Sequence, residues 1–162
     1  MLWLIGMMGS GKSTIGAEVA ERLGLEFVDM DVLHEQRWGS IVSQWASVGE
    51  SGFREREALL VAEVAARPAP AVVATGGGAI TSAAAVDLMR TSGTVVWLKA
   101  PPDTLASRLV EGPRRPILEK RALQDIYRER HEIYRAAAHH IVQTDGLSTE
   151  DVVEEVVTAW RG

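Results

Sequence analysis

The sequence predicts an α/β fold in which helices cover both faces of a five-stranded parallel sheet, giving three layers. Two observations support this expectation. Short apolar runs such as AVVAT (71–75) and TVVWL (94–98) are rich in β-branched residues, as are strands buried on both faces of a parallel sheet. Segments with apolar residues at helical spacing lie between such runs, and strands that alternate with helices are typical of a three-layer architecture.

The alternating pattern assigns an element to most parts of the chain. Strands are expected at residues 2–6, 26–29, 71–75, 94–98 and 139–144. Helices are expected at 14–24 and near 82–92, 102–110, 121–138 and 148–160. From 31 to 67, helical patterns are broken at Gly39, Gly49 and Gly52. We find no internal repeat or linker, so we expect one domain over residues 1–162.

Composition limits the classes of protein to consider. The 162 residues are 46% hydrophobic and 24% charged, which suits a globular chain with its own core. The chain contains no cysteine, so it has no disulfide or thiolate metal site, and this favours a cytoplasmic protein. The apolar start at residues 2–6 is too short for a signal peptide or a membrane span. A net charge of -5 argues against a general nucleic-acid surface, so we expect neither nucleic acid nor a membrane as a partner.

The first predicted strand is followed by GMMGSGKST (6–14), which matches GxxxxGK[ST] and opens into a helix. Ligands of such sheets bind beyond the carboxyl ends of the strands. The glycines allow successive backbone N–H groups to face a phosphate, Lys12 reaches the β and γ phosphates, and Ser13 ligates Mg²⁺. The alternative is a flexible glycine turn with a surface lysine. The strand before the motif and the helix after it favour a nucleoside triphosphate site.

The second predicted strand ends in FVDMD (27–31), with two aspartates two residues apart. In an extended segment Asp29 and Asp31 would lie on one face, with Cα atoms about 6.6 Å apart. The alternative is that Asp31 caps a helix beginning at Val32 while Asp29 ends the strand. Beside a phosphate loop, one carboxylate can assist the magnesium ion and the other can orient an acceptor hydroxyl and take its proton.

Two later loops also follow predicted elements of the sheet. TGGGA (75–79) is either a tight turn or a place where the backbone approaches a second small ligand closely. EGPRRPILEK (111–120) combines a basic pair with glycine and two prolines. Arg114 and Arg115 are either solvated charges or part of a lid that closes an arginine onto the transferring phosphoryl group.

Arg54 in GFRERE and Arg130 in YRERHEIY lie in predicted helices. Each is either a surface residue paired with neighbouring glutamates or one half of a clamp on a substrate carboxylate. Trp38 and Trp45 lie in the interrupted region from 31 to 67, and either is a candidate for lining the pocket.

Taken together, these motifs resemble those of the shikimate kinases, a branch of the nucleoside-monophosphate-kinase-like P-loop fold. GSGKST, DMD followed by EQR, GESGFRERE, TGGGA, RRP and YRERHEIY occur in the family's order and at close to its spacing. The resemblance implies phosphorylation of the shikimate 3-hydroxyl by ATP with Mg²⁺, a step of aromatic amino acid biosynthesis. We expect a monomer with a substrate-binding region at about 31–60 and a lid at about 111–121.

The resemblance also implies a role for individual residues. The implied catalytic residues are Lys12, Asp31 and Arg115. Nucleotide contacts are implied for Gly9, Ser10, Gly11, Lys12, Ser13, Thr14, Arg108 and Arg115. The implied magnesium contacts are Ser13 and, through water, Asp29. Shikimate contacts are implied for Asp31, Arg54, Gly76, Gly77, Gly78 and Arg130.

The sequence also departs from the family's pattern, and the same residues bear on rival functions. The family often has an arginine near the start of the last helix, whereas QTDGLSTED (143–151) contains no basic residue. A regulatory GTPase would need an asparagine in its guanine-reading motif, and the chain contains none. A gluconate kinase would share the P-loop and an arginine lid, but we would not expect the DxD, Arg54 and GGGA together. A non-catalytic P-loop protein would not need Asp31.

Overall fold

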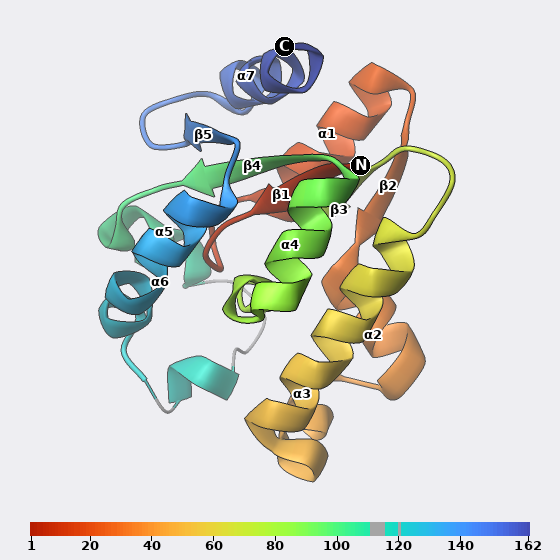
Figure 1. The fold of residues 1–162 in the computed structure, drawn as a ribbon. Coiled ribbons are helices and arrows are strands. Elements are labelled where there is room, and N and C mark those ends of the chain that lie inside the picture. Colours follow the sequence, from red (N-terminus) through yellow and green to blue (C-terminus); the bar gives the residue numbers. More distant parts are fainter. Residues whose placement is uncertain (111–115, 120) are drawn as a thin grey trace.

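The computed structural model describes residues 1–110, 116–119 and 121–162, and its centre is a five-stranded parallel sheet. The strands are β1 (Leu2–Ile5), β2 (Glu26–Asp29), β3 (Ala71–Ala74), β4 (Thr94–Lys99) and β5 (His140–Gln143). Their order across the sheet is β2-β3-β1-β4-β5 (Figure 1). In register, Leu2 of β1 lies opposite Val72 of β3 and Thr94 of β4. The predicted fold class is confirmed, and all five carboxyl ends point to one edge of the sheet.

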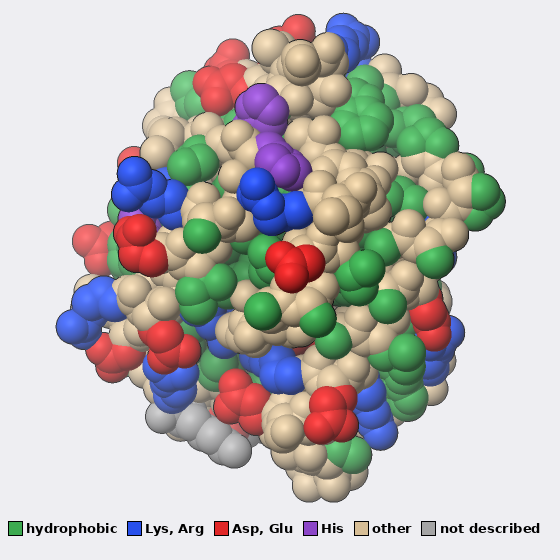
Figure 2. All heavy atoms as spheres, viewed as in Figure 1, with side chains coloured by type: hydrophobic (Ala, Val, Ile, Leu, Met, Phe, Trp, Pro, Cys, Tyr) green, Lys and Arg blue, Asp and Glu red, His purple; other side chains and the backbone are tan. Residues whose placement is uncertain are grey.

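Helices cover both faces of the sheet. They are α1 (Lys12–Leu23), α2 (Met30–Trp38), α3 (Ile41–Ala65), α4 (Ala83–Ser92), α5 (Pro102–Leu109), α6 (Leu123–Ala137) and α7 (Thr149–Arg161). Two short 3-10 helices, η1 (Ala79–Thr81) and η2 (Pro116–Glu119), follow β3 and precede α6. None of the helices in these described ranges is long and apolar enough to cross a membrane. Acidic and basic side chains are intermingled on the face shown in Figure 2.

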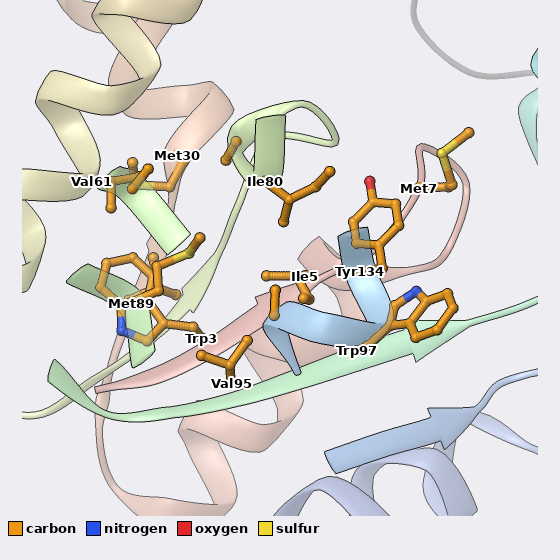
Figure 3. Close-up of a cluster of buried hydrophobic side chains, with 14 of the residues drawn as sticks. Trp3, Ile5, Met7, Met30, Val61, Ile80, Met89, Val95, Trp97 and Tyr134 are labelled. Carbon is orange, nitrogen blue, oxygen red and sulfur yellow. The ribbon is translucent and has the colours of Figure 1, made fainter. Parts of the chain in front are cut away.

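Alternating residues of the strands divide the core into two clusters. Trp3, Ile5, Val95 and Trp97 point toward α3, α4 and α6, where they meet residues such as Met89 (Figure 3). Leu2, Leu4, Val72, Val96 and Leu98 point to the other face, which α1 and α7 cover. This alternation follows from the period-two geometry of a strand. A strand covered on both faces therefore needs apolar residues at every position, as β1 and β3 have.

Local signals explain most helix boundaries, and two expectations need correction. Gly39 ends α2 and Gly49 kinks α3 at φ 69°, as the breaks in the pattern indicated. Gly52 does not interrupt α3, because it lies inside the helical turns that follow the kink. The helix after the P-loop begins at Lys12 and not at Thr14, because the last loop residues already form its first turn. At α7, Ser148 and Asp151 form a reciprocal capping box.

Candidate active site

The loop between β1 and α1 wraps around the Lys12 side chain. Nζ of Lys12 donates hydrogen bonds to the carbonyl oxygens of Gly6 and Met7, each at 2.9 Å, and to Oγ of Ser10 at 3.4 Å. Gly9 has φ 80°, and a Cβ there would lie 2.9 Å from the carbonyl oxygen of Leu105. The loop thus holds a cation at the N-terminal end of α1, an arrangement suited to phosphate.

Asp29 joins the phosphate loop to α2. Its Oδ2 accepts a hydrogen bond from Oγ of Ser13 at 2.6 Å, and its Oδ1 accepts from the backbone N–H groups of Asp31 and Val32 at 2.9 and 3.2 Å. Asp29 is therefore the N-cap of α2, so the alternative that Asp31 caps a helix starting at Val32 is wrong. The extended geometry expected for FVDMD is also wrong beyond Asp29, because α2 begins at Met30.

The Ser13 and Asp29 oxygens form a pair suited to magnesium. A serine hydroxyl and a carboxylate are hard oxygen ligands, and Mg²⁺ usually takes few protein ligands while keeping waters and substrate phosphates. Within the described ranges, no cluster of three or more histidine, aspartate or glutamate side chains is placed to hold a metal. The donor set therefore fits an ion that arrives with a nucleotide better than a permanently caged one.

One pocket at the carboxyl edge of the sheet brings together the phosphate loop and the loop after β3. Asp29 and Asp31 both line it despite the change from strand to helix between them. Its walls come from the phosphate loop, α2, α3, the loop after β3, α5, η2 and α6. Among the residues singled out from the sequence, those lining it are Gly9, Gly11, Lys12, Ser13, Thr14, Asp29, Asp31, Arg54, Gly76, Gly77, Gly78, Arg108 and Arg130. Ser10 lies beneath the loop, 1% exposed.

The glycine run, meaning Gly76, Gly77 and Gly78, leaves room for an ion pair between two residues of α3. Arg54 pairs with Glu57, and its guanidinium lies over the rings of Phe53 at 5.3 Å and Trp45 at 5.7 Å. A Cβ on Gly76 would lie 2.2 Å from Oε1 of Glu57, and one on Gly78 would lie 1.9 Å from Nη1 of Arg54. The side chains of Glu57 and Arg54 therefore require glycine at positions 76 and 78, a reason that neither interpretation of TGGGA included, and close approach of a ligand stays a prediction.

Glu57 is a pocket residue that the sequence reasoning missed. Its side chain is only 8% exposed, and burial raises the pKa of its carboxyl group while Arg54 acts in the opposite direction. The only sequence signal was its position three residues after Arg54, which is a common surface spacing as well. Phe53 and Thr75 also line the pocket without having been singled out as candidates. Of the two tryptophans, Trp45 lines it, and Trp38 packs on His34.

Arg130 and Tyr134 of α6 converge on the glycine run. Nη1 of Arg130 and the hydroxyl of Tyr134 donate to the carbonyl oxygen of Gly77 at 2.9 and 2.5 Å. Arg130 is 2% exposed, and its Nε has no hydrogen-bond partner among the residues described. Tyr134 stacks on Trp97 with ring centroids 5.5 Å apart (Figure 3). Burial raises the pKa of Tyr134, so its hydroxyl remains a proton donor.

On another side of the pocket, Arg108 of α5 connects to the segment after β5. Nη1 and Nη2 of Arg108 donate to Oγ1 and the carbonyl oxygen of Thr144 at 3.0 and 2.9 Å. Thr104 donates to Asp145 at 2.6 Å within the same corner. Pro116 and Ile117 of η2 complete this side of the pocket. Arg114 and Arg115, expected in a lid, lie outside the described residues.

Known proteins resemble the chain over nearly its whole length. The shikimate kinase family model matches residues 8–161. A shikimate kinase of Halorhodospira halophila is 41% identical, over 99% of this chain and 93% of that protein. A shikimate kinase of Francisella philomiragia is 36% identical, over 97% of this chain and 92% of that protein.

Solved structures agree with the sequence relatives. A shikimate kinase from Acinetobacter baumannii in complex with shikimate superposes with a TM-score of 0.91 at 34% identity, covering 97% of this chain and 90% of that one. The enzyme from Aquifex aeolicus gives 0.86 at 30% identity, covering 99% and 96%. A gluconokinase from Sinorhizobium meliloti, at 21% identity and a TM-score of 0.65, shares the fold. With the family model and these relatives matching nearly all of it, the chain belongs to the shikimate kinase family.

Proposed function

We propose that this shikimate kinase transfers the γ-phosphoryl group of ATP to the 3-hydroxyl of shikimate in the pocket at the carboxyl edge of the sheet. The observation that supports the proposal most is the meeting of a phosphate loop, the carboxylates of Asp29 and Asp31, and three arginines around one space. Phosphoryl transfer depends mainly on positioning and on neutralising charge, and these groups can supply both.

The nucleotide is held by the phosphate loop. Lys12, which binds loop carbonyls in this structure, would exchange some of these partners for the β and γ phosphates. Ser13 would ligate Mg²⁺, with Asp29 reaching the ion through water. The ion would neutralise charge on the phosphates. Arg108 would lie beside the nucleotide, and Arg115 would approach the phosphates from the lid.

The acceptor pocket, meaning the part lined by Asp31, Trp45, Phe53, Arg54, Gly76 and Arg130, would hold shikimate. Arg54 and Arg130, which both line the pocket, would bind its carboxylate. The glycine run, Gly76, Gly77 and Gly78, would let the substrate ring approach the backbone.

In the reaction, the 3-hydroxyl oxygen bonds to the γ phosphorus as the bond from that phosphorus to the β–γ bridging oxygen breaks. Asp31 orients the hydroxyl and takes its proton, and ADP leaves with the electron pair of the broken bond. Lys12 and Arg115 stabilise the charge that develops. The products are shikimate 3-phosphate and ADP, which places the enzyme in aromatic amino acid biosynthesis.

A coupled assay of ADP release tests the proposal directly, with shikimate, quinate and gluconate offered as acceptors. We expect turnover with shikimate and little with the other two. Phosphorylation of gluconate without phosphorylation of shikimate would refute the proposal and favour the related gluconate kinase activity. A monomeric state and a cytoplasmic location stay predictions from the sequence.

A further inference from the structure

His34 is a buried titratable residue that the proposed reaction does not use. It lies on α2, three residues after Asp31, with 1% of its surface exposed. Neither ring nitrogen has a hydrogen bond of standard geometry in the described ranges, although the Phe53 backbone lies close enough to act on the ring. Burying a polar group with poor hydrogen bonding costs free energy. A hydrocarbon side chain would avoid this cost, so the imidazole calls for an explanation.

The His34 ring joins α2 to α3 through aromatic contacts. It stacks on Phe53 of α3 with ring centroids 4.4 Å apart and an interplanar angle of 27°. On the α2 side it contacts Trp38 at 4.8 Å. Phe53 in turn contacts Trp45 at 5.7 Å and lies under the Arg54 guanidinium. The ring therefore supports, from behind, the wall of the acceptor pocket that Phe53, Trp45 and Arg54 form.

Charged groups of both signs surround this ring. A narrow internal cavity, too small for a water molecule, is lined by His34 together with Asp31 and Glu57. Arg54 and Arg56 of α3 also act on the imidazole, and Arg56 lies over the Trp38 ring. The remaining neighbours on this cavity, Met30, Leu60, Gly76 and Ala79, carry no charge. A proton on His34 would therefore interact with charged groups on both α2 and α3.

Burial has the largest effect on the pKa of His34. It lowers the pKa of His34, the backbone of Phe53 and the Asp31 carboxylate act to raise it, and Arg56 and Arg54 lower it further. The neutral ring is therefore the form that the packed structure favours. Because desolvation dominates, a proton on the ring is less unfavourable when the ring gains solvent, and separation of α2 from α3 would supply that solvent.

We propose that His34 is a positioning residue that holds α2 against α3 only while it is neutral, so that its protonation weakens acceptor binding without weakening nucleotide binding. The inference rests on the proposed function, since it takes the acceptor to be shikimate. Asp31 lies on one of the two helices, and Phe53 and Arg54 lie on the other. Ser13 meets α2 at its N-cap, Asp29, more than one helical turn before His34, so we expect ATP binding to respond far less than shikimate binding.

A second, electrostatic effect acts in the opposite direction. The experiment must therefore determine whether shikimate raises or lowers the pKa of His34. A substrate carboxylate on Arg54 would reduce the repulsion that this arginine exerts on a His34 proton, and so would favour protonation. Arg54 is, however, the weakest of the influences on His34 and burial is the strongest. We therefore expect separation of the helices to dominate, so that shikimate binding favours the neutral ring.

The first experiment follows the His34 ring by NMR in the wild-type enzyme, with its signals assigned by their loss in His34→Phe. We expect the titration midpoint to lie below the ordinary value of 6.5 and to fall further when shikimate is saturating, because linkage is reciprocal. A midpoint that shikimate raises or leaves unchanged would overturn the proposal. So would a ring that takes up its proton only when the whole protein unfolds.

The second experiment measures KM for shikimate and for ATP at the NMR midpoint and at high pH. Because half of the molecules are then protonated, the shikimate KM of the wild type should rise about twofold, with no matching rise for ATP. His34→Phe keeps an aromatic ring but cannot titrate, and it should lose this rise. His140→Gln removes an exposed histidine on β5 and should retain it.

An equal rise in His34→Phe, or an equal rise in the ATP KM of the wild type, would contradict the proposal. The NMR titration of the wild type decides the question even if His34→Phe does not fold. Absence of shikimate phosphorylation by the wild type at high pH would instead refute the proposed function itself, so the two failures are distinguishable.

Discussion

Arg130 has an unusual environment for a charged residue. It is almost fully enclosed by protein, and its guanidinium is held by the carbonyl oxygen of Gly77. A surface arginine pairing with glutamates at helical spacing was the alternative from sequence, and Arg128 two residues earlier does pair with Asp125 in that way. Burying a charge is costly unless it is well compensated, so the position suggests a task that repays the cost.

Replacing Arg130 should weaken binding of shikimate selectively. We expect Arg130→Ala to cost on the order of 2 kcal/mol, or about 30-fold in Kd, because a buried charge-assisted contact to the substrate carboxylate is lost. Titration calorimetry with shikimate and, separately, with ATP would measure both affinities. Arg128→Ala on the same helix is the exposed control and should bind both normally. An unchanged shikimate affinity in Arg130→Ala would remove this residue from the site.

Asp31 differs from Asp29 in what its side chain does in the fold. Asp29 already accepts hydrogen bonds from Ser13 and from the start of α2, whereas Asp31 lies in the first turn of that helix and faces the pocket. The division of labour between the two carboxylates, with one for the metal and one for the hydroxyl, is consistent with these positions.

The Asp31→Asn variant should separate chemistry from binding. We expect its kcat to fall by roughly 10²- to 10⁴-fold, the range typical of a lost general base, with ATP affinity retained. Steady-state kinetics together with nucleotide binding measurements would show this. Asp87→Asn on the surface of α4 makes the same chemical change at an exposed site and should be fully active. Near-normal turnover in Asp31→Asn would exclude the assigned role.

At the level of elements, α6 holds the glycine run in place. Tyr134 and Arg130 lie one helical turn apart and reach the same Gly77 carbonyl oxygen, while the Tyr134 ring rests on Trp97 of β4. The helix thereby ties the loop after β3 to a neighbouring strand. A loop of consecutive glycines has high conformational freedom, so external hydrogen bonds of this kind restrict it.

Removing the Tyr134 hydroxyl should therefore loosen this loop to a modest degree. We expect Tyr134→Phe to lower the free energy of unfolding by about 1 kcal/mol, since Arg130 still satisfies the carbonyl oxygen. Urea denaturation would measure the change, with Tyr127→Phe, a half-buried tyrosine of the same helix, as the matched control. Equal stabilities for the two variants would argue against a structural role for the hydroxyl.

The strands and helices were largely predictable, because the spacing of apolar residues distinguishes the two in this sequence. The five strands fell within one or two residues of their predicted positions. The start of α2 was not predictable, because FVDMD is compatible both with an extended strand and with an Asp29 cap. In the structure Asp29 caps the helix through Oδ1, and Ser13, which lies far away in sequence, donates to its Oδ2.

For the molecule as a whole, the pocket collects residues from the first loop through α6. Motif residues could be placed there from sequence because the ends of parallel strands share one edge. Glu57 could not, because helical spacing alone does not say which of several charged residues on α3 turns inward. That choice is made by packing, as the contacts of Glu57 with the glycine run show.

Since the pocket joins so many segments, ligand binding should stabilise the entire fold. At about 100 times its Kd, a ligand specific for the native state adds about 2.7 kcal/mol. For a chain of this size, that corresponds to a rise of roughly 5–10 °C in Tm. Thermal denaturation with shikimate should show this shift, whereas gluconate at the same concentration should not. If Arg130→Ala kept the full shift, the proposed acceptor pocket would be wrong.

The separation of the core into two clusters has a consequence for how this enzyme can change. The valines of α7 pack on the face of the sheet away from α3 and α6, which supply the arginines of the acceptor pocket. Substitutions that improve packing under α7 can therefore raise stability with little effect on substrate contacts. A variant strengthened on that face would tolerate disruptive substitutions near Arg54 and Arg130 that the unmodified chain would not survive. The face of the sheet covered by α7 is thus the natural starting point for evolving a new acceptor specificity.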